Sequence, residues 1–144
     1  NFEMNEKKEA PVSLDLANRD KGYLLGRLFA VYEYVQQSAL GRNLNATIKD
    51  KFYGAASAQP RKVFHLLDAN SANHLSKIGK QKPGLRINLE KDIGGIMDPM
   101  SPADDPFTAS MPDKSQALFA LGYYHQRNSY YQKPDNSASE ETPE

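Results

Sequence analysis

The chain has 144 residues, equal numbers of basic and acidic side chains (18 each) and no cysteine. This length favours a single domain that buries roughly two thirds of its unfolded surface. The lack of cysteine excludes a disulfide framework, a thiolate metal site and a cysteine nucleophile. No apolar run is long enough for a membrane span and no charged-then-apolar leader opens the chain, so we expect a cytoplasmic protein with no membrane partner.

The neutral net charge conceals an uneven distribution. Residues 1–18 hold two cations and four acids, residues 19–91 hold thirteen and five, and residues 92–144 hold three and nine. A basic middle is therefore flanked by acidic ends. We expect a flexible N-terminal arm over 1–17, a helical bundle domain over 18–133 and an acidic disordered tail over 134–144. Residue 1 is not methionine and Met4 follows, which suggests a piece cut from a longer polypeptide or an internal start.

Two helices are predicted in the first half of the domain. Asn18 or Asp20 can cap a helix that runs to about Leu40 and ends at Gly41. Its apolar stripe is too wide for a surface helix and predicts a central core helix. Asn45 then caps a short helix whose flanks carry Lys49 and Lys51, where long stems can lie along the bundle.

Three further helices complete the prediction. Pro60 suits the first turn of a third helix, with Arg61, Lys62 and His65 pointing outward. A fourth follows the basic turn at 80–84, and the proline-rich stretch 98–112 is predicted to be a loop.

The last helix runs over about 112–132 and has two apolar faces. One contains Ala117, Leu118, Leu121, Tyr124 and His125 and is assigned to the core. The other contains Phe119, Tyr123 and Tyr130 and is assigned to a partner. With no repeat and no alternating strand pattern, the sequence predicts an all-α, compact bundle of about five helices.

A search for catalytic chemistry finds little. The chain has no Gly-rich phosphate loop and no His-Glu-x-x-His motif. His74 and His125 fall on apolar faces, which favours core or interface roles over metal binding, and His65 lies near Asp68. We therefore predict no enzyme activity, no catalytic residue, no metal, no cofactor and no small-molecule substrate. An enzyme that uses His65 or His125 remains the less favoured alternative.

The basic middle is the stronger signal, because nine cations and two acids lie between Arg42 and Arg86. Lysine and arginine give sequence-independent affinity for phosphates by counterion release. A solvated charged face is the plainer alternative. Tyr53 is either a stacking platform for unpaired bases or a half-buried bundle residue.

Several strings resemble the C-terminal region of the type I-C CRISPR large subunit. They are Gly22–Val31, Asn45–Ile48, Tyr53–Ala58 with Pro60 and Val63-Phe64, Ile93–Asp98 and Leu118–Arg127. The likeness covers about residues 21–131. In that system the same region is also made separately, from an internal start, as the small subunit of the Cascade surveillance complex.

The resemblance implies a non-catalytic bundle that acts in antiviral defence. It implies contacts with the Cascade large and backbone subunits, other copies of the chain, the guide RNA–DNA complex and the displaced non-target DNA strand of the R-loop. Within the matching strings, the DNA-binding candidates are Arg27, Lys49, Lys51, Arg61 and Lys62. Arg42, Lys77, Lys80, Lys82 and Arg86 are added on charge alone. Two alternatives stay open: a purely structural scaffold, and an excised domain of the large subunit without DNA contact.

Overall fold

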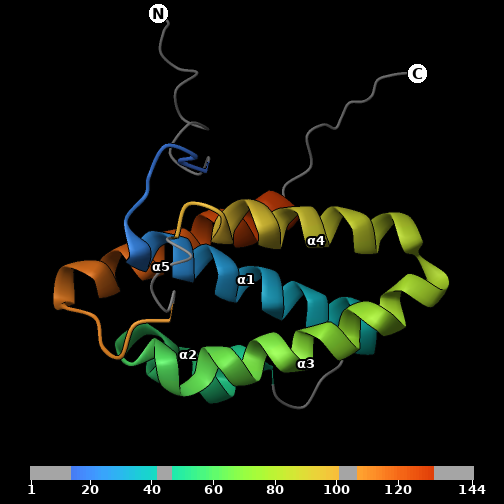
Figure 1. Ribbon diagram of the computed structural model, residues 1–144, viewed down its shortest axis with the longest axis horizontal. Coiled ribbons are helices and arrows are strands. Elements are labelled where there is room, and N and C mark those ends of the chain that lie inside the picture. The colour runs from blue at the N-terminus through green and yellow to red at the C-terminus, as the bar shows by residue number, and fades with distance from the viewer. Residues whose placement is uncertain (1–13, 42–46, 101–106, 132–144) are drawn as a thin grey trace, which may run out of the picture.

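The computed structural model describes residues 14–41, 47–100 and 107–131, and these form a bundle of five α-helices with no strand (Figure 1). The helices are α1 (Lys21–Leu40), α2 (Ile48–Ala58), α3 (Pro60–Gln81), α4 (Pro83–Met97) and α5 (Asp113–Tyr131). The predicted all-α fold is confirmed. No helix in these ranges is both long and apolar enough to cross a lipid bilayer.

α1 is the central helix, and each of the other four packs against it. Asp20 caps its start by accepting a 2.7 Å hydrogen bond from the Gly22 N–H. Gly41 ends it with a φ of 97°, a backbone conformation that favours glycine. The side chains buried around α1 cover nearly every direction, as expected of a helix that is apolar all round.

α5 packs most closely on α1, and the two helices run in the same direction. Gly22 faces Ser115 near the start of α5, whereas Tyr34 faces Tyr130 near its end. Cβ atoms built at Gly22, Gly26 or Gly122 would overlap backbone carbonyl oxygens of the facing helix. Glycine at these three positions therefore lets the two backbones touch.

α2 and α3 cover another side of α1. α2 begins with a capping box, in which Thr47 and Asp50 each accept a hydrogen bond from the other's backbone N–H. The cap is thus Thr47, while the predicted cap Asn45 lies outside the described residues. Pro60 occupies the first turn of α3, as predicted. The inward side of α3 is buried along its length through Val63, Phe64, Leu67, Ser71, Leu75 and Ile78.

α3 and α4 meet at Lys82 and diverge, so that α1 is visible between them in Figure 1. The segment that follows α4 supplies core residues that the sequence did not predict. Met100, Phe107 and Met111 are all buried, and the ring of Phe107 stacks on Phe64 with centroids 5.2 Å apart. The prediction of a loop over 98–112 holds at residues 98–100 and 107–112, but its contribution of core side chains was not predicted.

The ends of the predicted domain are described only in part. Residues 1–13 and 132–144, which hold most of the predicted arm and the whole predicted tail, lie outside the described ranges. Residues 14–17 precede α1, and the backbone N–H of Asp15 donates a 2.9 Å hydrogen bond to the Tyr23 hydroxyl.

Candidate nucleic-acid interface

The predicted basic residues of α2 are exposed, but they differ in their surroundings. Lys49 and Lys51 both lie on the outer surface of the helix. The Lys49 ammonium lies 5.5 Å from the ring centroid of Tyr123 and 5.9 Å from that of Tyr53. These are cation–π distances, so Lys49 also contributes to packing. Lys51 is exposed and makes no comparable ring contact with the described residues.

At the start of α3, Arg61 and Lys62 are neighbours with different roles. The Arg61 Nε–H donates a 3.1 Å hydrogen bond to the Phe107 carbonyl, and its backbone N–H donates to the Thr108 carbonyl. Arg61 therefore ties the segment after α4 to α3. Lys62 is exposed on the next position and makes no such tie.

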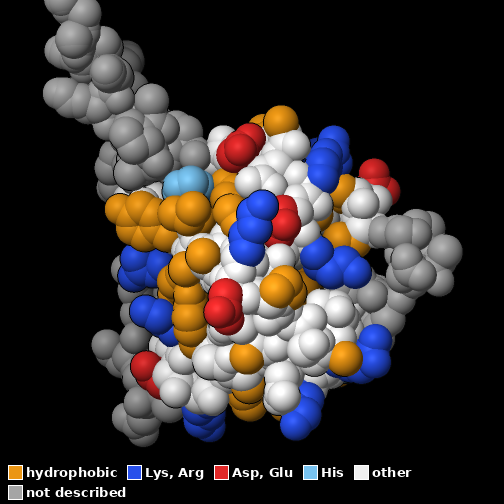
Figure 2. Space-filling model, turned by 90° about the vertical axis from the view of Figure 1, so that its left-hand side faces the viewer, with side chains coloured by type: hydrophobic (Ala, Val, Ile, Leu, Met, Phe, Trp, Pro, Cys, Tyr) orange, Lys and Arg blue, Asp and Glu red, His pale blue; other side chains and the backbone are white. Residues whose placement is uncertain are grey.

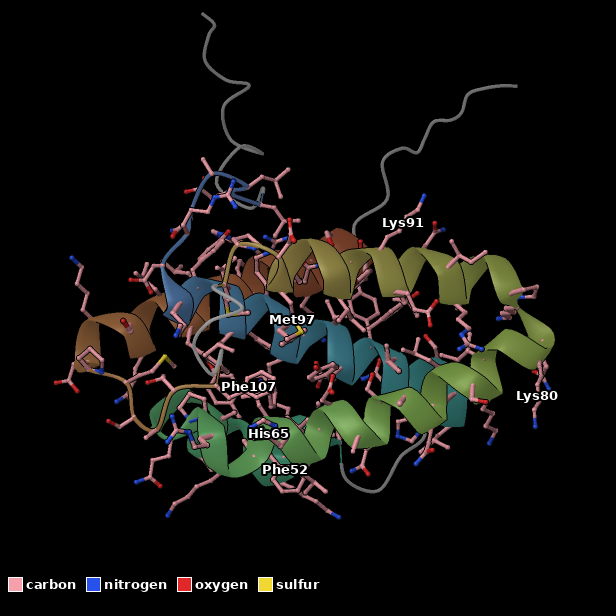
Figure 3. All side chains as sticks on the ribbon, in the orientation of Figure 1. Phe52, His65, Lys80, Lys91, Met97 and Phe107 are labelled. Carbon is pink, nitrogen blue, oxygen red and sulfur yellow. The ribbon has the colours of Figure 1, made fainter. Side chains whose placement is uncertain are left out.

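A second group of cations surrounds the α3–α4 turn. Lys77, Lys80 and Lys82 are exposed, and Figure 3 shows Lys80 near the end of the molecule where the two helices meet. Arg86 pairs with Glu90 at 3.1 Å and packs on Gly79, where a Cβ would lie only 2.8 Å from the Arg86 Cδ. Three lysines of this group thus remain directed at solvent.

Arg27 lies apart from both groups. It is half-buried on α1, and its Nε–H donates a 2.9 Å hydrogen bond to Gln126 of α5. Burial lowers the pKa of Arg27, an effect that nearby Tyr23 and Asp92 oppose. Arg27 borders a cleft of about 370 Å³ on the α1–α4 side, together with Arg19, Lys91, Asp92 and Asp98. This cleft could not be predicted from the sequence, because its residues lie far apart in the chain.

The structure therefore divides the predicted basic residues. Lys49, Lys51 and Lys62 lie on α2 and the adjoining start of α3, the three lysines of the turn lie at the other end of α3, and Arg27 lies elsewhere. Arg42 is outside the described residues. On the end of the molecule shown in Figure 2, Lys and Arg side chains are scattered among other side chains and form no continuous patch.

The aromatic predictions need correction. Phe119 and Tyr123 are buried in the chain's own core, with 0% and 7% of their surfaces exposed. Tyr130 is half-buried, stacks on Tyr34 at 4.2 Å and donates a 2.7 Å hydrogen bond to Asp92. This face packs on α1, while Leu121 and Tyr124, which were assigned to the core, are about half exposed (48% and 50%). The burial of the two α5 faces is therefore the reverse of the predicted one.

Tyr53 is half-buried, as one of its two predicted alternatives proposed. Its ring makes edge contacts with Phe29, Phe119 and Tyr123 at centroid distances of 5.3–5.7 Å. Burial raises the pKa of its hydroxyl. Because aromatic neighbours surround its ring, Tyr53 is poorly placed to stack on a nucleic-acid base.

The histidines occupy three separate environments. His65 makes an edge contact with Phe107 at 4.8 Å, and Figure 3 shows the two side by side. His74 is half-buried, and burial together with Lys77 lowers its pKa. The Nδ1 atom of His125 lies 2.8 Å from the Tyr23 hydroxyl oxygen. Within the described ranges, no group of three or more His, Cys, Asp or Glu side chains is arranged to hold a metal ion.

The model of the family described as CRISPR-associated protein (Cas_Csd1) matches residues 1–131. A search of curated proteins found no match. Since the family match spans most of the sequence, the chain belongs to the Csd1 family of CRISPR-associated proteins and is a Cascade-type CRISPR subunit.

Proposed function

We propose that this chain is the small subunit of a type I-C Cascade complex, or the equivalent region of its large subunit, and that it holds the displaced non-target DNA strand. It does so without catalysis, in the prokaryotic cytoplasm, while bridging the large and backbone subunits and other copies of itself around the guide RNA–DNA duplex. One observation carries this proposal: three exposed lysines lie on two helices that contact each other. Lys49 and Lys51 are on α2, and Lys62 is on α3.

The spacing of the two lysine groups suits an extended strand. Lys62 and Lys80 are eighteen residues apart on one helix, which corresponds to about 27 Å at 1.5 Å per residue. A single strand that lay along α3 would therefore meet basic side chains near both ends of the helix. Such contacts with phosphates are blind to sequence, as a displaced strand requires when the guide RNA reads the target by base pairing.

The test uses charge-neutral variants in the reconstituted complex. The first variant, Lys51→Gln/Lys62→Gln, removes one exposed lysine from α2 and one from α3. The second, Lys77→Gln/Lys80→Gln, removes two exposed lysines from the other end of α3. Lys91→Gln/Lys114→Gln, on α4 and α5, is the matched control. Lys49 and Arg61 are left intact because both make contacts within the bundle.

We expect target-DNA loading to weaken in both α2–α3 variants and not in the control. The slope of log affinity against log salt should fall by about 1.4 for two lost single-strand phosphate contacts. Unchanged loading and slope in both variants, with normal assembly, would rule out this DNA-holding surface.

A scaffold without DNA contact is the second candidate, and one observation favours it. Leu121 and Tyr124 lie one turn apart on α5 and are both about half exposed, which suits a contact with another subunit. Leu121→Ser/Tyr124→Ser should then reduce incorporation into the complex, while DNA loading per assembled complex stays constant. The lysine variants should instead reduce DNA loading per assembled complex and leave incorporation constant, so the two functions are separable.

A further inference from the structure

A groove of about 170 Å³ lies between the diverging helices α3 and α4. Its charged lining residues are acidic, unlike the lysines proposed to bind DNA. Ser71, Leu75 and Ile93 are buried or half-buried within it, and the exposed residues Asp68, Ala72 and Glu90 border it. The groove is therefore apolar inside and carries a carboxylate from each helix.

Ser71 is the unusual residue of the groove. Its side chain is buried, with 3% of the residue exposed, and its Oγ has no hydrogen-bond partner among the described residues. A buried serine within a helix can satisfy its hydroxyl by bonding the carbonyl four residues earlier, whereas Ser71 does not. Leaving a buried hydroxyl unpaired is energetically unfavourable.

The Ser71 hydroxyl can serve two neighbours at once. Besides the groove, Ser71 borders a cavity of about 30 Å³ beside Tyr32, Gln36 and His74. A hydroxyl has one donor and two acceptor positions. It can therefore donate toward this small cavity and accept a hydrogen bond from a donor on the side of the groove.

The two carboxylates are only weakly engaged within the chain. Asp68 accepts a 2.7 Å hydrogen bond from the Tyr32 hydroxyl, but no Lys or Arg in the described ranges forms an ion pair with it. Glu90 pairs with Arg86 at 3.1 Å, and both side chains are exposed by more than 40%. Exposed pairs of this kind contribute little stability. The groove is thus open to another cation and hostile to phosphate.

We propose that this groove binds an arginine side chain of a protein partner. The methylene stem would lie on Ala72, Leu75 and Ile93, since arginine stems pack on apolar surface. The guanidinium would lie between Asp68 and Glu90, with one N–H directed to the Ser71 oxygen. Its five donors in a planar fork suit two carboxylates and a hydroxyl better than a lysine ammonium does.

The size of the groove is consistent with this ligand, because an engineered cavity of about 150 Å³ accepts a molecule as large as benzene. The proposal does not depend on DNA binding, since the lysines assigned to DNA are not among the groove residues. A nucleic acid is the wrong class of partner here, because two carboxylates repel its phosphates.

The experiment is an NMR titration of the ¹⁵N-labelled full chain. The probe is N-acetyl-arginine methylamide, and the control is the citrulline analogue, which has nearly the same shape and no charge. We expect saturable shifts of the amides of Ser71, Ala72, Leu75 and Ile93 with the arginine probe, and binding about tenfold weaker with citrulline.

Variants assign the effect to the groove. Asp68→Asn/Glu90→Gln should abolish the preference for arginine, whereas Asp98→Asn/Asp113→Asn removes two acids elsewhere and should leave it intact. Ala72→Leu should block the probe while retaining both carboxylates, which covers the case in which the first variant folds poorly. Absence of saturable shifts, equal response to the two probes, or unchanged binding in Asp68→Asn/Glu90→Gln would overturn the proposal.

Discussion

The Tyr123 hydroxyl on α5 donates a 2.6 Å hydrogen bond to the Glu33 carboxylate on α1, and both residues are buried (7% and 6% exposed). An acid so far from solvent depends on its donor. Tyr123→Phe removes that donor and should destabilise the fold by about 1–3 kcal/mol, because a buried acceptor is left unpaired. Tyr123→Phe/Glu33→Leu should recover part of this loss. Urea unfolding at pH 7 measures both effects, and equal stability of the single variant and the parent would contradict the expectation.

The Tyr123–Glu33 hydrogen bond and two other tyrosine–carboxylate hydrogen bonds predict how the stability of the fold varies with pH. Burial, followed by hydrogen bonding to Asp68, Glu33 and Asp92, raises the pKa of Tyr32, Tyr123 and Tyr130 above the ordinary value of 10.0. Above that pH the unfolded chain releases protons that the folded protein retains. The contribution of the three tyrosines to the free energy of unfolding is therefore complete below pH 10. It is lost as the pH rises toward their pKa values in the folded protein.

Each of these tyrosines can add a slope of at most about 1.4 kcal/mol per pH unit above pH 10. Urea unfolding between pH 8 and pH 11 should show a flat region followed by a steep decline. Tyr124→Phe, at a half-exposed tyrosine outside these three hydrogen bonds, is the matched control. Tyr32→Phe, in contrast, should make the decline shallower.

The glycines of the bundle should respond to alanine in opposite ways. A Cβ at Gly26 would overlap the Phe119 carbonyl oxygen, whereas a Cβ at Gly94 would meet nothing within 4 Å. Gly26→Ala should separate α1 from α5 and destabilise by about 1–3 kcal/mol or more. Gly94→Ala, within α4, should stabilise by about 0.4–1 kcal/mol. Thermal unfolding of the two variants checks the sign of each change, and a stabilising Gly26→Ala would refute the close approach.

Arg61 and Lys62 offer a matched pair for separating structural from binding roles. Arg61→Ala removes the hydrogen bond to the Phe107 carbonyl and should cost about 0.5–1.5 kcal/mol of stability. Lys62→Ala should change stability by less than about 0.5 kcal/mol, as expected for an exposed side chain. Unfolding midpoints in urea would distinguish them. A Lys62 variant that is destabilised as much as the Arg61 variant would show that both cations are structural.

The number and order of the helices could be predicted because their signals are local. Asp20, Gly41 and Pro60 mark helix ends at the predicted places, and the apolar periodicity of α3 identifies its buried side. The reversal of the two α5 faces shows where local signals stop. Both faces are apolar, so periodicity alone cannot choose between them.

A further signal for α5 was present in the sequence. Gly122 shares a face with Phe119 and Tyr123, and Gly22 and Gly26 are one turn apart on α1. Small residues on both helices allow close contact, which would have assigned that face to the core. The isolated core residues Met100, Phe107 and Met111 offered no such signal, because a proline-rich loop has no periodicity. The grouping of the lysines on the surface was equally unpredictable, because it depends on which helices pack together. The lysines predicted as one basic region lie at both ends of α3.

The parallel pairing of α1 with α5 has a consequence for how the chain reaches this fold. The closest helix pair joins segments about ninety residues apart, so the entropy of closing that long loop must be overcome before the pair forms. Contacts this distant in sequence slow folding. During synthesis, the apolar surface of α1 must wait for α5 to leave the ribosome, and until then the nascent chain depends on chaperones or partial packing against α2 and α3 to avoid aggregation.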